Sequence, residues 1–140
     1  MEKNNIRWSR TMIVTFVDLQ DSSNKLNDVP IDKRATLIEI LEGMLQQREP
    51  FICELLGENK FDLMIGIGPL GCAQYAGPDH DPPYLMAVGL KPHPPGEIEF
   101  LMGNTPTPIR PCMPFEEILD IVRHFQETGQ RSPNFVWEEV

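Results

Sequence analysis

The last fifth of the chain, residues 110–140, constrains the fold more than any other stretch. Charged residues lie on one side of the expected helix. Apolar residues recur at helical spacing on the other side: Phe115, Ile118, Leu119, Val122 and Phe125. Pro114 suits a first helical turn and Gly129 suits the left-handed residue that ends a helix, so we expect a helix from Pro114 to Thr128. Asn134–Glu138 then alternates as a strand does. A helix with one apolar face, followed by a terminal strand, requires a sheet from the rest of the chain.

The preceding residues supply that sheet. The patterning predicts a first strand at Thr11–Asp18, a polar loop over Asp21–Asp28 and a helix over Ile31–Gln47, in which Gly43 suggests a close packing contact. Short strands bounded by glycine or proline follow: Phe51–Leu56, Lys60–Gly66, Cys72–Ala76, Tyr84–Leu90 and Glu97–Met102. Asn104–Pro111 then returns in extended form. We therefore expect one α+β domain over residues 1–140, a single mainly antiparallel sheet of about six or seven strands with two helices on one face.

Charge narrows the class of partner. The 140 residues carry a net charge of −9, and the sequence pI is near 4.7. Proteins that bind nucleic acid rely on Lys and Arg to displace counterions, so we expect no nucleic-acid partner. An acidic chain instead suits a basic protein partner, or simply solubility.

Cysteine spacing and hydropathy indicate the cellular compartment in which the protein is expected to act. Cys53, Cys72 and Cys112 are odd in number and widely spaced, which is typical of reduced thiols in partly buried positions. No apolar run approaches the roughly eighteen residues of a membrane span, and the N-terminal residues lack the layout of a signal peptide. We expect a cytoplasmic protein with no membrane contact.

Signals for catalysis or metal binding are weak. The G-x-G-x-x-G spacing of residues 66–71 is followed by a strand pattern rather than a helix, so it predicts a hairpin connection. Asp79, His80 and Asp81, with His93 further on, are residue types that bind metal, but the ligand spacing of a zinc site is absent and a proline-flanked polar loop explains them without metal. No serine or cysteine lies in a nucleophile signature. We expect no enzyme, metal or cofactor, and His124 to be a partly buried surface residue.

Acidic side chains on the predicted strands and turns are the candidate binding residues. A solvated acidic surface explains them without function, whereas clustered charge of one sign also speeds docking of a basic protein. With Tyr84 as an aromatic anchor, the candidate contacts are Asp79, Asp81, Glu97, Glu99, Glu138 and Glu139. Alternation places Glu97 and Glu99 on one face of their strand. Trp137 and Phe125 are expected in the core and Gly129 at the helix end.

Several short motifs resemble a known family. They are Gly66-Ile-Gly68 with Gly71-Cys-Ala-Gln, Pro83-Tyr84, Glu99-Phe100, Thr107-Pro-Ile-Arg, His124-Phe125, Thr128-Gly129, Arg131-Ser-Pro and Val136-Trp137-Glu138. Over Glu58 to Glu138 the chain resembles the immunity proteins of bacterial polymorphic toxin systems, above all their first-numbered family of small α+β proteins ending in a Trp-Glu strand. The resemblance implies a cytoplasmic antidote to a secreted or contact-delivered toxin, often a nucleic-acid deaminase. It transfers only the structural positions Trp137 and Glu138, and no catalytic residue.

Three hypotheses of function follow. The leading one is a non-enzymatic inhibitor, a monomer or weak homodimer, that binds a basic toxin domain and occludes its active site. The second is a small-molecule-binding or enzymatic α+β domain that uses the Asp79–Asp81 loop and His93. The third is a secretion adaptor or chaperone that binds a non-catalytic segment of its partner.

Overall fold

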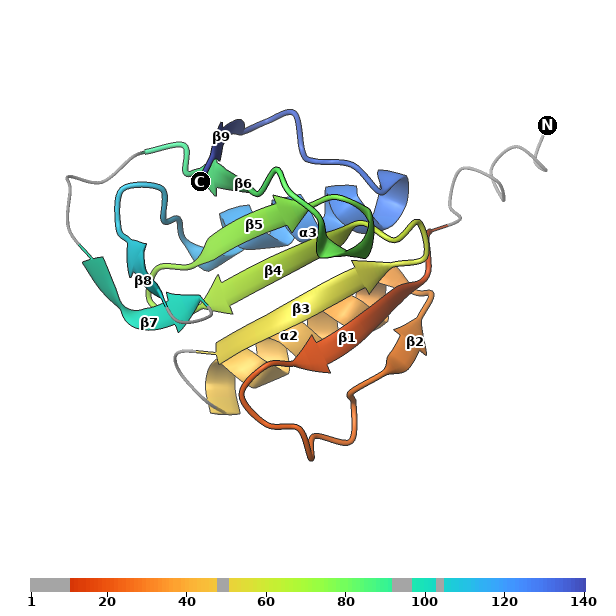
Figure 1. Cartoon of the computed structure of the whole chain (residues 1–140). Coiled ribbons are helices and arrows are strands. Elements are labelled where there is room, and N and C mark those ends of the chain that lie inside the picture. Colours follow the sequence, from red (N-terminus) through yellow and green to blue (C-terminus); the bar gives the residue numbers. More distant parts are fainter. Residues whose placement is uncertain (1–10, 48–50, 92–96, 103–104) are drawn as a thin grey trace.

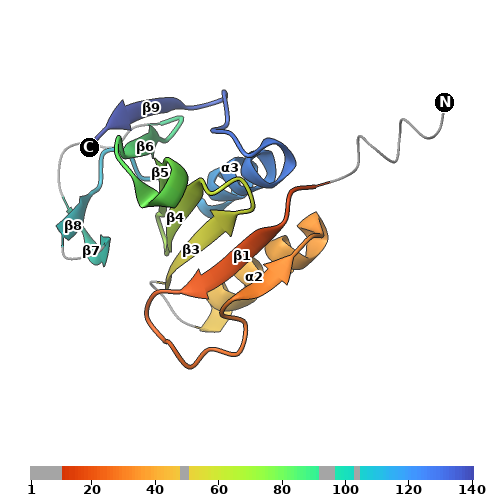
Figure 2. The same ribbon diagram turned by 45° about the vertical axis from the view of Figure 1, so that its right-hand side comes forward.

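One seven-stranded antiparallel sheet organises the chain (Figure 1). The computed structural model describes residues 11–47, 51–91, 97–102 and 105–140. The strand order is β2 (Val29–Ile31), β1 (Val14–Asp18), β3 (Phe51–Gly57), β4 (Asp62–Ile67), β5 (Cys72–Ala76), β6 (Leu85–Val88) and β9 (Val136–Glu139). Helices α2 (Arg34–Gln47) and α3 (Phe115–Thr128) cover one face of it (Figures 1 and 2). The predicted α+β class, the single main sheet and the two helices are confirmed.

Two predictions of strand placement are wrong. Residues 29–31 form β2, which pairs with β1, so α2 begins at Arg34 rather than at Ile31. Proline is tolerated in β2 because β2 is an edge strand and needs no second hydrogen-bonded neighbour. β7 (Glu97–Met102) does not join the main sheet; it pairs with β8 (Thr105–Pro108), which was predicted only as an extended return. The two form a separate hairpin beside the sheet (Figure 1).

The end of α3 is fixed to the sheet through one carbonyl group. Gly129 has φ of 76°, and its N–H donates to Phe125 O at 2.7 Å, so the predicted left-handed helix end is confirmed. Its carbonyl oxygen accepts hydrogen bonds from Tyr75 Oη at 3.0 Å and Asn59 Nδ2 at 3.2 Å. A Cβ at this position would lie 2.4 Å from Asn59 Nδ2. Both the backbone conformation and the space therefore require glycine.

Aromatic residues join the helices to the inner face of the sheet. Phe125 is 1% exposed, and its ring meets the Tyr75 ring edge-on at 6.1 Å. The Trp137 ring also meets the Tyr75 ring edge-on at 6.1 Å, and its indole N–H donates to Ser132 O at 2.9 Å. Trp137 is only partly buried, yet it packs against the main core. The predicted core roles of Phe125 and Trp137 are confirmed.

Gly43 does not mark a close contact, contrary to the prediction. A Cβ built on it meets no atom within 4 Å, and its φ is not positive. Replacing Gly43 by alanine is therefore expected to raise the free energy of unfolding by about 0.5–1 kcal/mol, because alanine loses less backbone entropy in a helix. Urea unfolding measures this, with Gly129→Ala as the control that should lose stability. A Gly43→Ala protein less stable than wild type would contradict the geometry.

Two further observations concern the burial of the cysteines and the length of the helices. All three cysteines are 0% exposed, more deeply buried than predicted. Neither helix in the described part of the chain is long and apolar enough to cross a bilayer.

Candidate functional site

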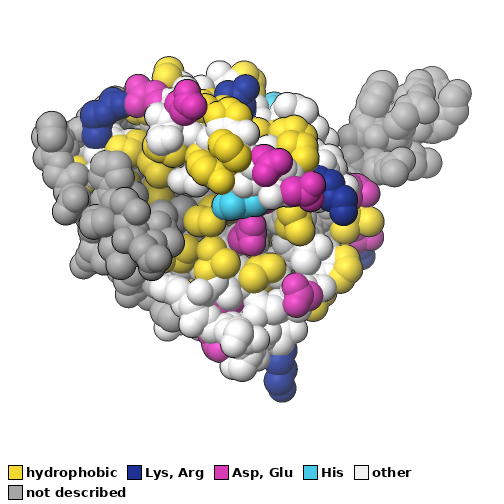
Figure 3. Space-filling model, viewed as in Figure 1, with side chains coloured by type: hydrophobic (Ala, Val, Ile, Leu, Met, Phe, Trp, Pro, Cys, Tyr) yellow, Lys and Arg dark blue, Asp and Glu magenta, His cyan; other side chains and the backbone are white. Residues whose placement is uncertain are grey.

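The face of the sheet opposite the helices is the main surface that the described elements leave uncovered (Figure 2). We call it the open face. Strand register places one row of its side chains across the sheet, from β1 to β9: Val17, Glu54, Met64, Gln74, Met86 and Glu138. Apolar side chains occupy much of this surface and acidic ones lie between them (Figure 3). Leu56, Ile13 and Val136, on the same face by alternation, are 37%, 40% and 64% exposed.

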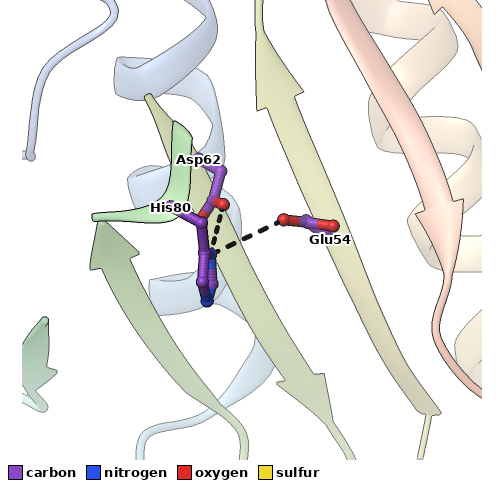
Figure 4. A group of neighbouring side chains, drawn as sticks. All are labelled: Glu54, Asp62 and His80. Carbon is purple, nitrogen blue, oxygen red and sulfur yellow. Dashed lines mark hydrogen bonds and ion pairs between the residues drawn. The ribbon is translucent and has the colours of Figure 1, made fainter. Parts of the chain in front are cut away.

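An acid–imidazole cluster lies within the open face (Figure 4). His80 Nδ1 is 2.6 Å from Asp62 Oδ2 and 3.9 Å from Glu54 Oε2. Glu54 pairs across the sheet with Met64, two residues from Asp62 on the next strand. Diagonal neighbours of this kind stand about 7–8 Å apart at their backbones, within reach of a glutamate side chain. The register of β3 and β4 thus brings the two carboxylates together.

A tight turn after β5 places the imidazole. The 3-10 turn η1 (Pro78–His80) is closed by hydrogen bonds from His80 N to Gly77 O at 3.0 Å and from Asp81 N to Pro78 O at 3.2 Å. Asp79 and His80 have φ of 60° and 63°, which directs the chain back over the start of β4. Asp79 N also donates to Lys60 O at 3.2 Å, so η1 is attached to the β3–β4 turn.

Tyr84 also contacts His80. Its hydroxyl donates to His80 O at 3.1 Å, and the two rings lie 5.4 Å apart. The ring of Tyr84 is only half-buried. An aromatic side chain held in this way can contact a partner with little loss of conformational entropy.

Burial and mutual charge determine how the cluster titrates. Asp62 is 1% exposed, whereas the side chains of Glu54 and His80 are 24% and 44% exposed. Burial raises the pKa of Glu54 to about 7, and its hydrogen bond to the Asp62 carboxylate adds to this rise. The hydrogen bond to Asp62 raises the pKa of His80. The cluster therefore gains or loses protons near neutral pH.

The same residue types could in principle bind a metal ion. One ligand atom from each of Glu54, Asp62 and His80 lies within 4.8 Å of the others. Two ligands of one zinc ion stand about 3 Å or more apart, because each bond is about 2.0–2.2 Å long. The 2.6 Å between His80 Nδ1 and Asp62 Oδ2 is instead a hydrogen-bond distance. The arrangement as it stands binds protons, and a shared metal ion would require the ligand atoms of His80 and Asp62 to move apart.

The structure brings some of the predicted binding residues together and separates others. Asp79 and Asp81 are exposed on and beside η1, next to Tyr84. Glu138 lies on the open face in the same row as Glu54, four strands away and thus about 19 Å distant. It pairs with Arg110. Glu139 alternates to the other face at the edge strand, so it does not belong to this surface.

The remaining two predicted residues belong to the hairpin. Glu97 and Glu99 lie on β7, outside the main sheet, and their side chains are outside the described part of the structure, as is His93. Because β7 is not one of the strands of the main sheet, Glu97 and Glu99 do not belong to the open face, and their role as partner contacts stays a prediction.

Sequence reasoning missed Glu54 and Asp62. Each is a single acid within an otherwise apolar strand, Ile-Cys-Glu-Leu-Leu and Phe-Asp-Leu-Met-Ile. A charged residue in an interior strand is a signal because burying it is costly unless it is paired. The sequence pattern indicated only Asp79 and Asp81, in the same loop, as possible partners of His80. Its partner in the structure, Asp62, is 18 residues away in the sequence.

The sequence and the fold were compared with family models, with curated proteins and with solved structures. None of the three comparisons returned a match.

Proposed function

We propose that this chain is a non-enzymatic binding protein that docks a basic protein domain on its open face. The observation that carries the proposal is the acidic patch, which we define as Glu54, Asp62, Asp79 and Asp81 around His80. It lies on a sheet face that also exposes apolar side chains and a half-buried tyrosine. Interfaces commonly combine apolar contact area, an aromatic anchor and charged groups at the rim.

The charge state of the acidic patch favours a cationic occupant. Glu54 and Asp62 lie beside the imidazole of His80, and Asp79 and Asp81 are its neighbours in the chain. The raised pKa of Glu54 means that this carboxyl group retains a proton near neutral pH. A guanidinium or ammonium group from a partner can displace that proton, so that the ionised carboxylates accept charge-assisted hydrogen bonds from the cation. The net charge of −9 attracts a basic partner over a longer range and speeds encounter.

The resemblance to immunity proteins supplies the identity of that partner in the proposal. A toxin that acts on nucleic acid needs a basic cleft for its polyanionic substrate. The acidic patch occupies this cleft in place of the substrate and excludes it. The chain is then the antidote, acting in the cytoplasm of the cell that makes it.

Charge reversal within the patch tests this proposal. The partner to use is the C-terminal domain encoded by the gene beside this one. Asp81→Lys should slow association with that domain by about tenfold at low salt, and the difference should shrink as salt screens the charges. The matched control is Glu42→Lys, which changes net charge equally but lies exposed on α2, behind the sheet.

Stopped-flow or surface-based kinetics at two salt concentrations give the association rates. Co-expression of the toxin domain with each variant then gives growth rescue. Equal slowing by both variants would mean that only net charge matters. Failure of the wild-type chain to bind or to protect would remove the proposal altogether.

The cluster also supports a second candidate function, acid–base catalysis or ligand binding by Glu54 and His80. A carboxyl group with a pKa near 7 beside an imidazole is the usual composition of a general acid and base. In that case Glu54→Gln should abolish a measurable turnover or a ligand-induced rise in melting temperature. An inhibitor with no chemistry of its own shows neither effect in wild type.

A further inference from the structure

Two cysteines meet where the segment before α3 joins the sheet. Gly71 N donates to Met113 O at 2.7 Å, and Met113 N donates to Gly71 O at 2.9 Å, which makes an antiparallel bridge between the two residues. In such a ladder the next pair of facing residues is not hydrogen-bonded, and its Cα atoms are about 4.5 Å apart. That next pair is Cys72 and Cys112.

The side chains confirm that the two residues face one another. Both are 0% exposed and share a small apolar cluster with Ile52 and partly buried Leu70. This cluster is distinct from the main core, to which the neighbouring Ala73 belongs. A hydrogen bond from Cys72 lowers the pKa of the Cys112 thiol against the opposing effect of burial. Cα separations of about 4.4–6.8 Å accommodate a disulfide without backbone movement, so the bridge geometry is suitable.

We propose that Cys72 and Cys112 are a redox-sensitive dithiol that hydrogen peroxide converts into a cross-strand disulfide. The thiolate of Cys112 attacks one peroxide oxygen, which breaks the O–O bond and releases water, leaving a sulfenic acid. The Cys72 sulfur then displaces the hydroxyl group, which leaves as a second water. Two thiol protons and two electrons have passed to the peroxide, and one S–S bond has formed.

The disulfide ties the start of β5 to the segment that enters α3. Between the two cysteines lie η1, β6 and the β7–β8 hairpin, a loop of about 40 residues. Closing a loop of that size restricts the unfolded chain considerably. Oxidation should therefore raise the melting temperature by about 10 °C, and a thiol reductant should reverse the change.

Peptide mapping identifies the linked residues. The wild-type protein is treated with hydrogen peroxide, unfolded with an alkylating agent present and digested without reductant. Trypsin is unsuitable because Lys91 and Arg110 precede proline, so both cysteines stay in one peptide. A glutamate-specific protease cuts after Glu97 and Glu99 and separates them. We expect a linked pair of peptides and an intact mass lower by about 2 Da.

Cys53 provides an internal control. It lies in the main core, where burial, together with the charges of Asp18 and Glu54, raises its pKa far above the usual value. Cys53→Ser should keep the link and the rise in melting temperature, whereas Cys72→Ser should lose both. If Cys72→Ser does not fold, the wild-type peptide map decides alone.

Three results would overturn the proposal. The first is that the cysteines remain unlinked after oxidation, and the second is a disulfide that includes Cys53 or a second chain. The third is a mass increase of about 16 Da, which means that one cysteine has gained an oxygen atom and no disulfide has formed.

Discussion

Replacing Phe125 by alanine is expected to lower the free energy of unfolding by about 3–5 kcal/mol. Phe125 is 1% exposed and packs edge-on against Tyr75 between α3 and the sheet. The substitution removes the buried ring and leaves a cavity, since the rigid strands cannot close around the missing volume. Urea unfolding, followed by circular dichroism, measures the loss.

Phe115→Ala is the matched control. It makes the same chemical change at the start of the same helix, but Phe115 is only partly buried. Its loss should stay below about 2 kcal/mol, because less apolar area is removed from the interior. Equal losses for the two variants would show that Phe125 is not the main contact between α3 and the sheet.

The second large effect expected is a fall in stability between pH 5 and pH 8. The pKa of Glu54 rises from 4.5 to about 7 on folding, so the folded protein binds this proton more tightly than the unfolded chain. The resulting stability is fully present below pH 4.5 and is lost as the pH rises through 7. The raised pKa of His80 acts in the same direction above pH 6.5. Because Glu54 is partly exposed, we expect about 1–2 kcal/mol.

Glu54→Gln tests the origin of this pH dependence. The amide cannot ionise, so the variant should lose most of the fall between pH 5 and pH 8 and be more stable than wild type at pH 8. Glu42→Gln removes a carboxylate from the exposed side of α2 and should keep the wild-type profile. Thermal melts at half-unit pH intervals provide the comparison. A Glu54→Gln profile parallel to that of wild type would show that other groups cause the fall.

Much of the fold could be predicted because it depends on local patterns. The α3 helix has one apolar stripe and a glycine where it ends, so its bounds were predicted to within one residue. The strand β2 was missed because three residues, one of them proline, are too few for alternation to be visible. The strand β7 was predicted as a strand, but its partner depends on contacts between distant residues, which no local pattern records.

The site was less predictable for the same reason. Asp79, Asp81 and Tyr84 were named because they lie close together in the sequence. The partners of His80 come from β3 and β4, and their positions depend on strand register and on the positive φ of His80 itself. The only local sequence signal for these partners was a single acidic residue within each otherwise apolar strand.

The attachment of α3 to the β3–β4 turn links the two sides of the sheet. Asn59 bonds the carbonyl group of Gly129 behind the sheet, while the adjacent Lys60 accepts the hydrogen bond of Asp79 in front of it. Two neighbouring residues thus connect the helical layer to the acidic patch through hydrogen bonds. Substitutions at the end of α3 should therefore alter affinity for a partner that never touches them.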